Sequence, residues 1–254
     1  MTEQQPTEPP SDVTDAPERL FEPEADRAGY VRRMFGEIAG RYDLMNAVMT
    51  GGRHHAWRRA TARALVQPGD RVIDVGCGTG DLALACARAG AGSVLGVDFA
   101  RPMLPLARRK TRARAARHVD FAVADALRLP LADASVDVWC AGFVVRNIPD
   151  LGAALAEAHR VLRPGGRIGV LDIPRVEGGL LAPLARLHLR RVVPLLGRAI
   201  SGHRDAYRYL PVSAERFLSV DELSARLATA GFEVQRVRCF GLGSVALHVA
   251  VRSR

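Results

Sequence analysis

The chain has 254 residues and is 48% hydrophobic, which suits one sizeable core rather than two equal domains. Its formal net charge is +9, but residues 1–26 carry eight acidic side chains and one arginine; subtracting this −7 leaves +16 on the remainder. The first segment is also rich in proline and poor in apolar residues, so we expect 1–26 to be a disordered acidic tail. No uncharged apolar run reaches ~18 residues, and 1–26 lacks the apolar stretch of a secretory signal. We therefore expect a cytoplasmic protein without a membrane-spanning helix.

The positive charge is almost entirely arginine, because Lys110 is the only lysine. Arginine favours paired contacts to anions, and a basic chain can bind nucleic acid through its phosphates. The aromatic side chains do not alternate with the basic runs as a base-stacking surface requires, so we expect no nucleic-acid partner. Cys77, Cys86, Cys140 and Cys239 form no C-x-x-C pair, which favours a reduced compartment, and we expect no metal site.

Residues 27–66 are expected to form an N-terminal helical lid, and short β-branched runs alternate with helix-forming stretches after it. The strand-forming runs are 71–75, 93–98, 119–125, 136–143, 167–173, 232–240 and 244–251. The helix-forming stretches are 81–89, 102–115, 150–162 and 220–230. Leucines and arginines alternate in 178–218, which predicts a helical cap after the fifth strand. The pattern predicts an α/β fold over 67–254: a doubly wound, mostly parallel seven-stranded sheet of the Rossmann-like kind.

The turn after the first strand, "GCGTG", contains Gly76, Gly78 and Gly80, whose lack of Cβ lets backbone N–H groups approach a ligand. This turn alone leaves nicotinamide and flavin cofactors open. Asp98 ends the second strand, where a carboxylate can accept from two ribose hydroxyls, and Asp125 ends the third, where it can accept from an adenine amino group. The G-x-G-x-G spacing is one residue shorter than the dinucleotide fingerprint, so the pattern favours a nucleoside cofactor without a pyrophosphate.

The stretch 71–173 resembles the class I S-adenosylmethionine-dependent methyltransferases. This resemblance implies S-adenosyl-L-methionine as cofactor, with Asp74 and the glycines at its methionine end, Asp98 at the ribose, and Asp125 with Ala126 at the adenine. The implied cofactor-binding residues are Asp74, Gly76, Gly78, Thr79, Gly80, Asp98, Asp125, Ala126 and Gly142. Gly142 departs from the pattern, because enzymes acting on ubiquinone precursors often have a serine there.

The run "YDLMNAVMTGGRHHAW" (42–57) is similar to the N-terminal signature of the ubiquinone and menaquinone biosynthesis C-methyltransferases. "RVLRPGG" (160–166) fits their second signature, and "FVVRNIPD" (143–150) and "DAYRYLPVS" (205–213) extend the likeness from about residue 30 to residue 251. The chain departs at Asp172-Ile173-Pro174, where these enzymes usually have Glu-x-Ser. The resemblance implies C-methylation of a prenylated quinol or quinone precursor, with demethylmenaquinone as the first choice.

Methylating a ring carbon requires electron density from a neighbouring phenolate, and a free phenol has a pKa of about 10. A base or a fixed cation near the acceptor would lower this barrier. The catalytic candidates are His54, Arg146, Tyr42 and Asp43, with His55 beside them. The candidates for the substrate wall are Asn46, Met49, Trp57, Asn147 and Tyr207. Helix packing is the competing role for His54 and Trp57.

Three alternatives stay open at this point. A related methyltransferase could act on another small phenolic or polyketide-like acceptor, and a non-catalytic adenosine-binding or nucleic-acid-associated protein could use the same fold. Helices within 178–218 could pack on the core or lie on the inner membrane face as a peripheral contact for a lipophilic acceptor. The sequence also leaves a homodimer open.

Overall fold

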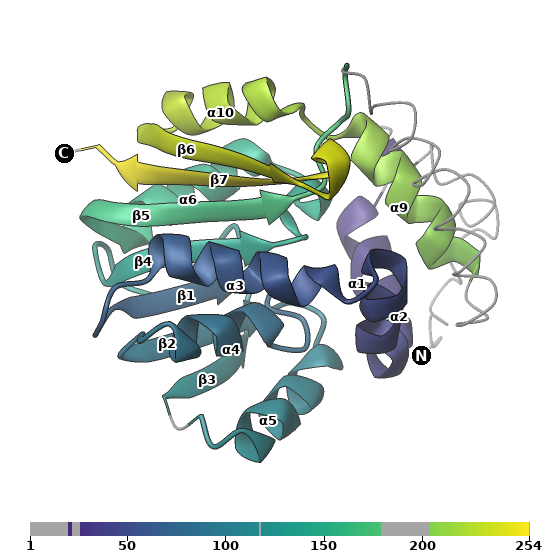
Figure 1. The fold of residues 1–254 in the computed structure, drawn as a ribbon, viewed down its shortest axis with the longest axis horizontal. Helices are drawn as coiled ribbons and strands as arrows, with labels where there is room; N and C mark the ends of the chain where they lie inside the picture. Colours follow the sequence, from purple (N-terminus) through teal and green to yellow (C-terminus); the bar gives the residue numbers. More distant parts are fainter. Residues whose placement is uncertain (1–19, 22–25, 117, 179–203, 254) are drawn as a thin grey trace, which may run out of the picture.

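Seven strands form one sheet in the order β3-β2-β1-β4-β5-β7-β6 (Figure 1). The structure, a computed structural model, describes residues 20–21, 26–116, 118–178 and 204–253, and only the backbone of 204–208. The strands are β1 Arg71–Val75, β2 Ser93–Asp98, β3 Val119–Val123, β4 Val136–Gly142, β5 Leu162–Asp172, β6 Phe232–Phe240 and β7 Val245–Arg252. The first five are parallel, and β7 is antiparallel to both β5 and β6. The predicted fold class is therefore confirmed.

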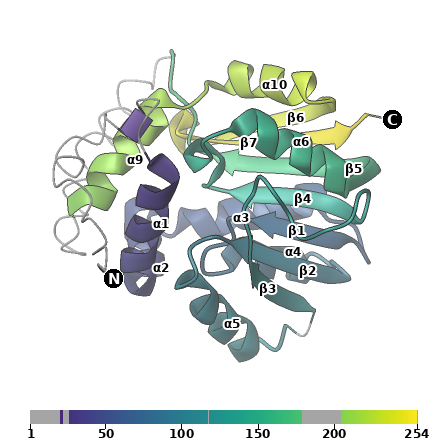
Figure 2. The same cartoon turned by 180° about the vertical axis from the view of Figure 1, so that it is seen from behind.

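Helices cover both faces of this sheet and one of its ends. They are α1 Arg27–Ile38, α2 Tyr42–Thr50, α3 Arg53–Leu65, α4 Asp81–Arg88, α5 Met103–Ala113, α6 Leu151–Val161, α9 Arg204–Arg216 and α10 Val220–Thr229. Short 3₁₀ turns occur at η3 Ala39–Arg41, η4 Val145–Asn147 and η6 Gly241–Gly243. Figure 1 shows α3 and α4 in front of the sheet, and Figure 2, from behind, shows α6 in front of it.

Two hydrophobic clusters fill the two interfaces between sheet and helices. Alternate strand residues divide between them: Val72 and Val138 face the α3–α4–α5 side, whereas Ile73 and Trp139 face the α6–α10 side. Both faces of the central strands are buried, as a parallel sheet covered by helices requires. This packing fixes the carboxyl ends of the strands relative to one another, and β1 and β4, where the strand order reverses, are the central pair.

The segment 27–66 divides between two places. Helix α3 packs on the sheet, and its Leu65 lies so close to Gly169 of β5 that a Cβ there would come within 2.2 Å of Leu65 Cδ1. Helices α1 and α2 lie instead beyond the carboxyl ends of the strands, beside α9 (Figures 1 and 2). Only α1 and α2 therefore have the position expected of a lid.

The segments expected to be a tail and a cap are described in part. Leu20 is buried and the Phe21 ring stacks on Tyr209 of α9, 6.0 Å between centroids, so two residues of the expected tail make ordered contacts. Of 178–218, residues 179–203 lie outside the described part of the chain, and α9 follows them. Helices α9 and α1 meet through Tyr209 and Tyr30, whose ring centroids are 5.8 Å apart.

Candidate functional site

A pocket that is open to solvent lies where β1, β2 and β4 end, which is where open α/β sheets bind ligands. Eight predicted site residues line it: Tyr42, Gly76, Gly78, Asp98, Asp125, Ala126, Gly142 and Asn147. Most of the remaining wall is apolar and comes from Ala28, Val31, Phe35, Val75, Phe99, Met103, Ala124, Leu127, Phe143, Val144, Ile148 and Pro149. The pocket thus joins the predicted cofactor turn to α1 and α2, which a local sequence pattern does not place together.

The glycine turn packs closely against its neighbours, and a side chain would collide at Gly76. Gly76 has φ +64°, and a Cβ on it would lie 2.4 Å from Val144 Cγ2. A Cβ on Gly78 would lie 3.6 Å from the Tyr42 ring, so α2 packs directly over the turn. At Gly142, where related enzymes often have a serine, an added Cβ would lie 3.3 Å from Leu82 Cδ2, which is a tight contact.

The two acids at the strand ends differ in their surroundings. Asp98 is mostly buried, and its carboxylate accepts hydrogen bonds from the N–H of Gly78 at 2.7 Å and of Ala100 at 2.8 Å. Burial raises its pKa, and these two bonds counteract the rise. Asp125 is exposed and accepts from the N–H of Leu127 at 2.9 Å. Asp98 therefore also holds the glycine turn in shape, whereas Asp125 stands at the pocket mouth.

Asp74 lies inside the sheet, on β1, and is not part of the pocket wall. It is 1% exposed, and no described group forms a hydrogen bond with its Oδ2. Burial raises the pKa of Asp74 from 3.8 to about 7, against the lowering effect of the Arg58 charge. A buried acceptor without a partner is costly, so this position suits the cationic group of a ligand.

Lys110 joins α2 to the start of α4. Its Nζ lies 2.7 Å from Asp43 Oδ2 and 2.8 Å from Asp81 Oδ1, and it donates to Thr79 Oγ1 at 2.8 Å. The Thr79 hydroxyl in turn donates to Asp43 at 2.6 Å. Thr79, expected beside the cofactor, and Asp43, expected in catalysis, are therefore engaged with each other and with the only lysine.

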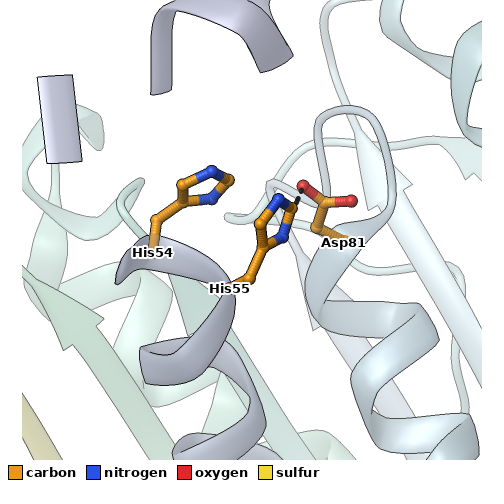
Figure 3. Close-up of side chains that lie close together, drawn as sticks. All are labelled: His54, His55 and Asp81. Carbon is orange, nitrogen blue, oxygen red and sulfur yellow. Dashed lines mark ion pairs between the residues drawn. The ribbon is translucent and has the colours of Figure 1, made fainter. Parts of the chain in front are cut away.

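His54, His55 and Asp81 form a cluster at the beginnings of α3 and α4 (Figure 3). Their ligand atoms all lie within 4.8 Å of one another, a spacing that a metal ion can bridge. However, Arg58 Nη1 lies 2.6 Å from His54 Nδ1, and a guanidinium can only donate. Neutral His54 then carries its proton on Nε2, so neither ring nitrogen offers a free lone pair, and the Arg58 charge repels a cation. We assign no metal to this cluster.

The same hydrogen bond bears on His54 as a candidate base. Burial and the charge of Arg58 lower its pKa to about 4, so the ring is neutral near pH 7. His54 is 1% exposed, is not part of the pocket wall, and its Nε2 forms no hydrogen bond with a described group. This geometry gives His54 a free donor rather than a free acceptor.

Arg146 and Asn147 occupy the turn η4 after β4. The Arg146 guanidinium lies behind the wall, 2.7 Å from Asp172 Oδ1, and donates to the carbonyl of Phe143 at 2.7 Å. Asn147 is at the wall, and its Oδ1 accepts from the hydroxyl of Tyr209 at 3.2 Å. This bond leaves Asn147 Nδ2 buried without a described partner.

The other substrate candidates lie around the pocket rather than in its wall. Met49 packs with the α1–α9 cluster, and Asn46 Nδ2 is buried without a described partner. Trp57 is in the core, with its ring 6.4 Å from Phe143, which is a wall residue. The side chain of Tyr207 lies outside the described residues.

Sequence reasoning missed Tyr209, two residues beyond Tyr207, and Arg58. A helix brings residues four apart to one face, so the His54–Arg58 spacing was a usable signal. The apolar wall had no such signal, because its members come from five separate segments.

Solved structures with this fold include methyltransferases of low sequence identity. The S-adenosylmethionine-dependent methyltransferase of Thermotoga maritima has a TM-score of 0.63 at 21% identity, over 87% of this chain and 99% of that one. The [4+2]-cyclase SpnF has a TM-score of 0.65 at 19% identity, over 88% and 95%. These likenesses show the fold alone.

The sequence relatives are closer. The demethylmenaquinone methyltransferase of Thermus thermophilus is 46% identical over 221 residues, which cover 86% of this chain and 100% of the relative. The ubiquinone/menaquinone biosynthesis C-methyltransferase of Roseobacter denitrificans is 37% identical over 229 residues, or 89% and 92%. The profile of the ubiE/COQ5 methyltransferase family matches residues 24–252. The chain therefore belongs to the ubiE/COQ5 methyltransferase family, and it is an S-adenosylmethionine-dependent methyltransferase.

Proposed function

We propose that this chain transfers a methyl group to a ring carbon of a prenylated quinol, with demethylmenaquinone as the acceptor. The similarity to the demethylmenaquinone methyltransferase of Thermus thermophilus supports this acceptor. The observation that carries the proposal is the pocket, which adjoins the glycine turn, has a mostly apolar wall and is lined by two polar side chains from the acceptor signatures, Tyr42 and Asn147. An apolar wall suits a lipophilic ring and also excludes water from the reaction.

The residues present fit S-adenosyl-L-methionine. When bound, this cofactor supplies a methyl group already activated as a sulfonium. Asp98 and Asp125 offer carboxylates at the ends of adjacent strands for the hydroxyl and amino groups of a nucleoside. The unpartnered Oδ2 of Asp74 offers a buried acceptor for an ammonium group. Binding would thus use acceptors that are already fixed by the sheet.

The acceptor oxygen requires a donor and a nearby positive charge. Tyr209 holds the Asn147 amide so that Nδ2 is the free end, and this N–H can donate to a phenolate as it forms. The charge of Arg146, fixed by Asp172 immediately behind the wall, stabilises the same anion without accepting a proton. Tyr42 contributes a hydroxyl from the side of α2. The chemistry proposed for these residues is therefore stabilisation of the phenolate.

Methyl transfer to demethylmenaquinone in liposomes is the direct test, with a soluble phenol lacking the prenyl chain as the second acceptor. We expect the methylated quinol with the first acceptor and little product with the second. Methylation of the soluble phenol alone would favour the related enzyme with another acceptor, and no binding of S-adenosylhomocysteine would favour a non-catalytic protein. Asn147→Leu should lower turnover by about 10- to 100-fold with S-adenosylhomocysteine affinity unchanged.

A lipophilic acceptor has to reach the pocket from a bilayer, so we also propose a peripheral membrane contact. No helix in the described part of the chain is long and apolar enough to span a bilayer. Co-sedimentation with anionic liposomes tests this contact, and absence of co-sedimentation at low salt would contradict it. The homodimer stays a prediction, for which light scattering is the measurement.

A further inference from the structure

Phe21 is a partly buried aromatic residue in the segment that the sequence predicts to be a disordered acidic tail. It precedes residues 24–252, which the family profile matches, so the likeness to the family gives it no role. Its neighbour Leu20 is 2% exposed and belongs to the apolar cluster that joins α1, α2 and α9. Two residues near the beginning of the chain are therefore packed into helices of which α1 and α2 line the pocket.

Three side chains pack on the Phe21 ring. The ring of Tyr209 stacks on it, with 6.0 Å between centroids and 11° between planes. The guanidinium carbons of Arg27 and Arg216 lie 5.0 and 5.3 Å from its centroid. A guanidinium over an aromatic ring is attracted by the negative face of the ring, and stacked rings gain further contact area. Phe21 therefore restricts the positions of both Tyr209 and Arg27.

Tyr209 and Arg27 in turn bind two consecutive residues of the pocket wall. The hydroxyl of Tyr209 donates to Asn147 Oδ1 at 3.2 Å, and Arg27 Nη2 donates to the carbonyl oxygen of Ile148 at 2.9 Å. These wall residues are the last residue of η4 and the one after it. One bond fixes the side chain of Asn147, and the other fixes the backbone beside it. Together they determine where Asn147 Nδ2 points.

The Tyr209 hydroxyl is suited to hold the Asn147 amide in one orientation. Tyr209 is 1% exposed, and burial raises its pKa against the lowering effect of the nearby Arg146 and Arg27 charges. The hydroxyl therefore keeps its proton and donates to Oδ1, which leaves Nδ2 without a partner among the described residues. A small displacement of a group that acts on the reacting atoms is costly, so the support of Tyr209 matters for the rate.

We infer that Phe21 is a positioning residue for methyl transfer, because through Tyr209 and Arg27 it orients the Asn147 amide toward the acceptor oxygen. The inference rests on the proposed function, in which Asn147 donates to the phenolate. It assigns a role to a segment that the sequence leaves without one. A purely structural role for Phe21 would lower stability, but its effect on the rate would not depend on the side chain at position 147.

Methyl transfer to demethylmenaquinone in liposomes, corrected for the folded fraction, measures the effect. Phe21→Ala should lower kcat by about 3- to 10-fold, with the acceptor KM and S-adenosylhomocysteine affinity changed by less than about 2-fold. Phe21→Tyr keeps the ring and should keep kcat within about 2-fold. Arg27→Ala should resemble Phe21→Ala. Arg216→Ala is the matched control and should leave kcat unchanged, because Arg216 packs on the same ring but forms no hydrogen bond with the pocket wall, all of which is described.

A double-mutant cycle with Asn147→Leu is the decisive measurement. In that background Phe21→Ala should lower kcat by less than about 2-fold more, because the amide that it positions is gone. Equal losses of kcat in the two backgrounds, or a normal kcat in Phe21→Ala, would overturn the inference while leaving the proposed function intact. An unmodified protein that methylates no quinol would overturn the proposed function, and the inference with it.

Hydrogen exchange of peptides that span 143–150 provides a readout without an acceptor. Exchange there should be faster in Phe21→Ala than in Arg216→Ala, because only the first change loosens both bonds to the wall. Equal exchange in the two variants would contradict the proposed path from Phe21 to Asn147.

Discussion

Replacing Asp74 by asparagine should stabilise the free protein at neutral pH, although the sequence predicts a role for this residue in cofactor binding. The pKa of the Asp74 carboxyl rises from its ordinary value of 3.8, which we take for the unfolded chain, to about 7 in the folded protein. Because the folded value is the higher one, the stability that Asp74 contributes is fully present below pH 3.8 and is lost as the pH rises to 7. The loss amounts to about 4 kcal/mol when complete, of which about 2 kcal/mol falls between about pH 5.5 and about pH 8.

Urea unfolding of the wild type and Asp74→Asn at these two pH values, without cofactor, measures the difference. The free energy of unfolding of the variant relative to the wild type should increase by about 2 kcal/mol from the lower to the higher pH. Asp120→Asn, an exposed acid on β3, is the control and should show no such change. A difference that stays constant with pH, or that falls, would refute the assignment of a raised pKa to Asp74.

Four further outcomes follow from the contacts. Gly76→Ala places a Cβ 2.4 Å from a valine methyl at φ +64°, so it should cost about 2 kcal/mol or more in urea unfolding and weaken S-adenosylhomocysteine in calorimetry; normal affinity would contradict this packing. Asp172→Asn leaves the buried Arg146 charge unpaired and should lower the free energy of unfolding by about 3–5 kcal/mol, so a loss below about 1 kcal/mol would be evidence against the pair. Lys110→Met should cost about 1 kcal/mol and speed proteolysis of the N-terminal helices, and unchanged proteolysis would show that the ion pairs do not hold them. His54→Gln should leave any inflection of the pH–rate curve between about pH 5.5 and about pH 8 in place, because its pKa is about 4; a shifted inflection would show that His54 titrates there.

Local patterns predicted most of the fold because the strands of the parallel part are short, β-branched and separated by helices. The central β1 was predicted at its observed bounds, 71–75, and β3 ended at 123 rather than 125. β5 begins at Leu162 rather than 167, because Leu162 pairs with Val136 of β4 before a shift in register. The place of β7 between β5 and β6 depends on pairing between distant segments, which no local pattern carries.

The site was predictable where a residue type and a strand end coincide, as at Asp98 and Asp125. The site was not predictable where the role of a side chain depends on its burial and its contacts. Nothing in the sequence shows that Arg58 is buried, or that the same arginine donates to one ring nitrogen of His54. Tyr209 and Tyr207 are likewise equivalent in the sequence, and only the packing of α9 on α1 selects the contact of Tyr209 with Asn147.

The packing of α3 has a consequence for folding during synthesis. The ring of Trp57 on α3 packs near those of Phe143 and Phe240, at 6.4 and 6.3 Å between centroids, so its packing is completed only when β6 has been made. Phe240 is made roughly 180 residues after Trp57, which at about 5–20 residues per second takes about ten to forty seconds. Until Phe240 is made, the Trp57 part of α3 is incompletely covered, and we expect a chaperone to bind the nascent chain there.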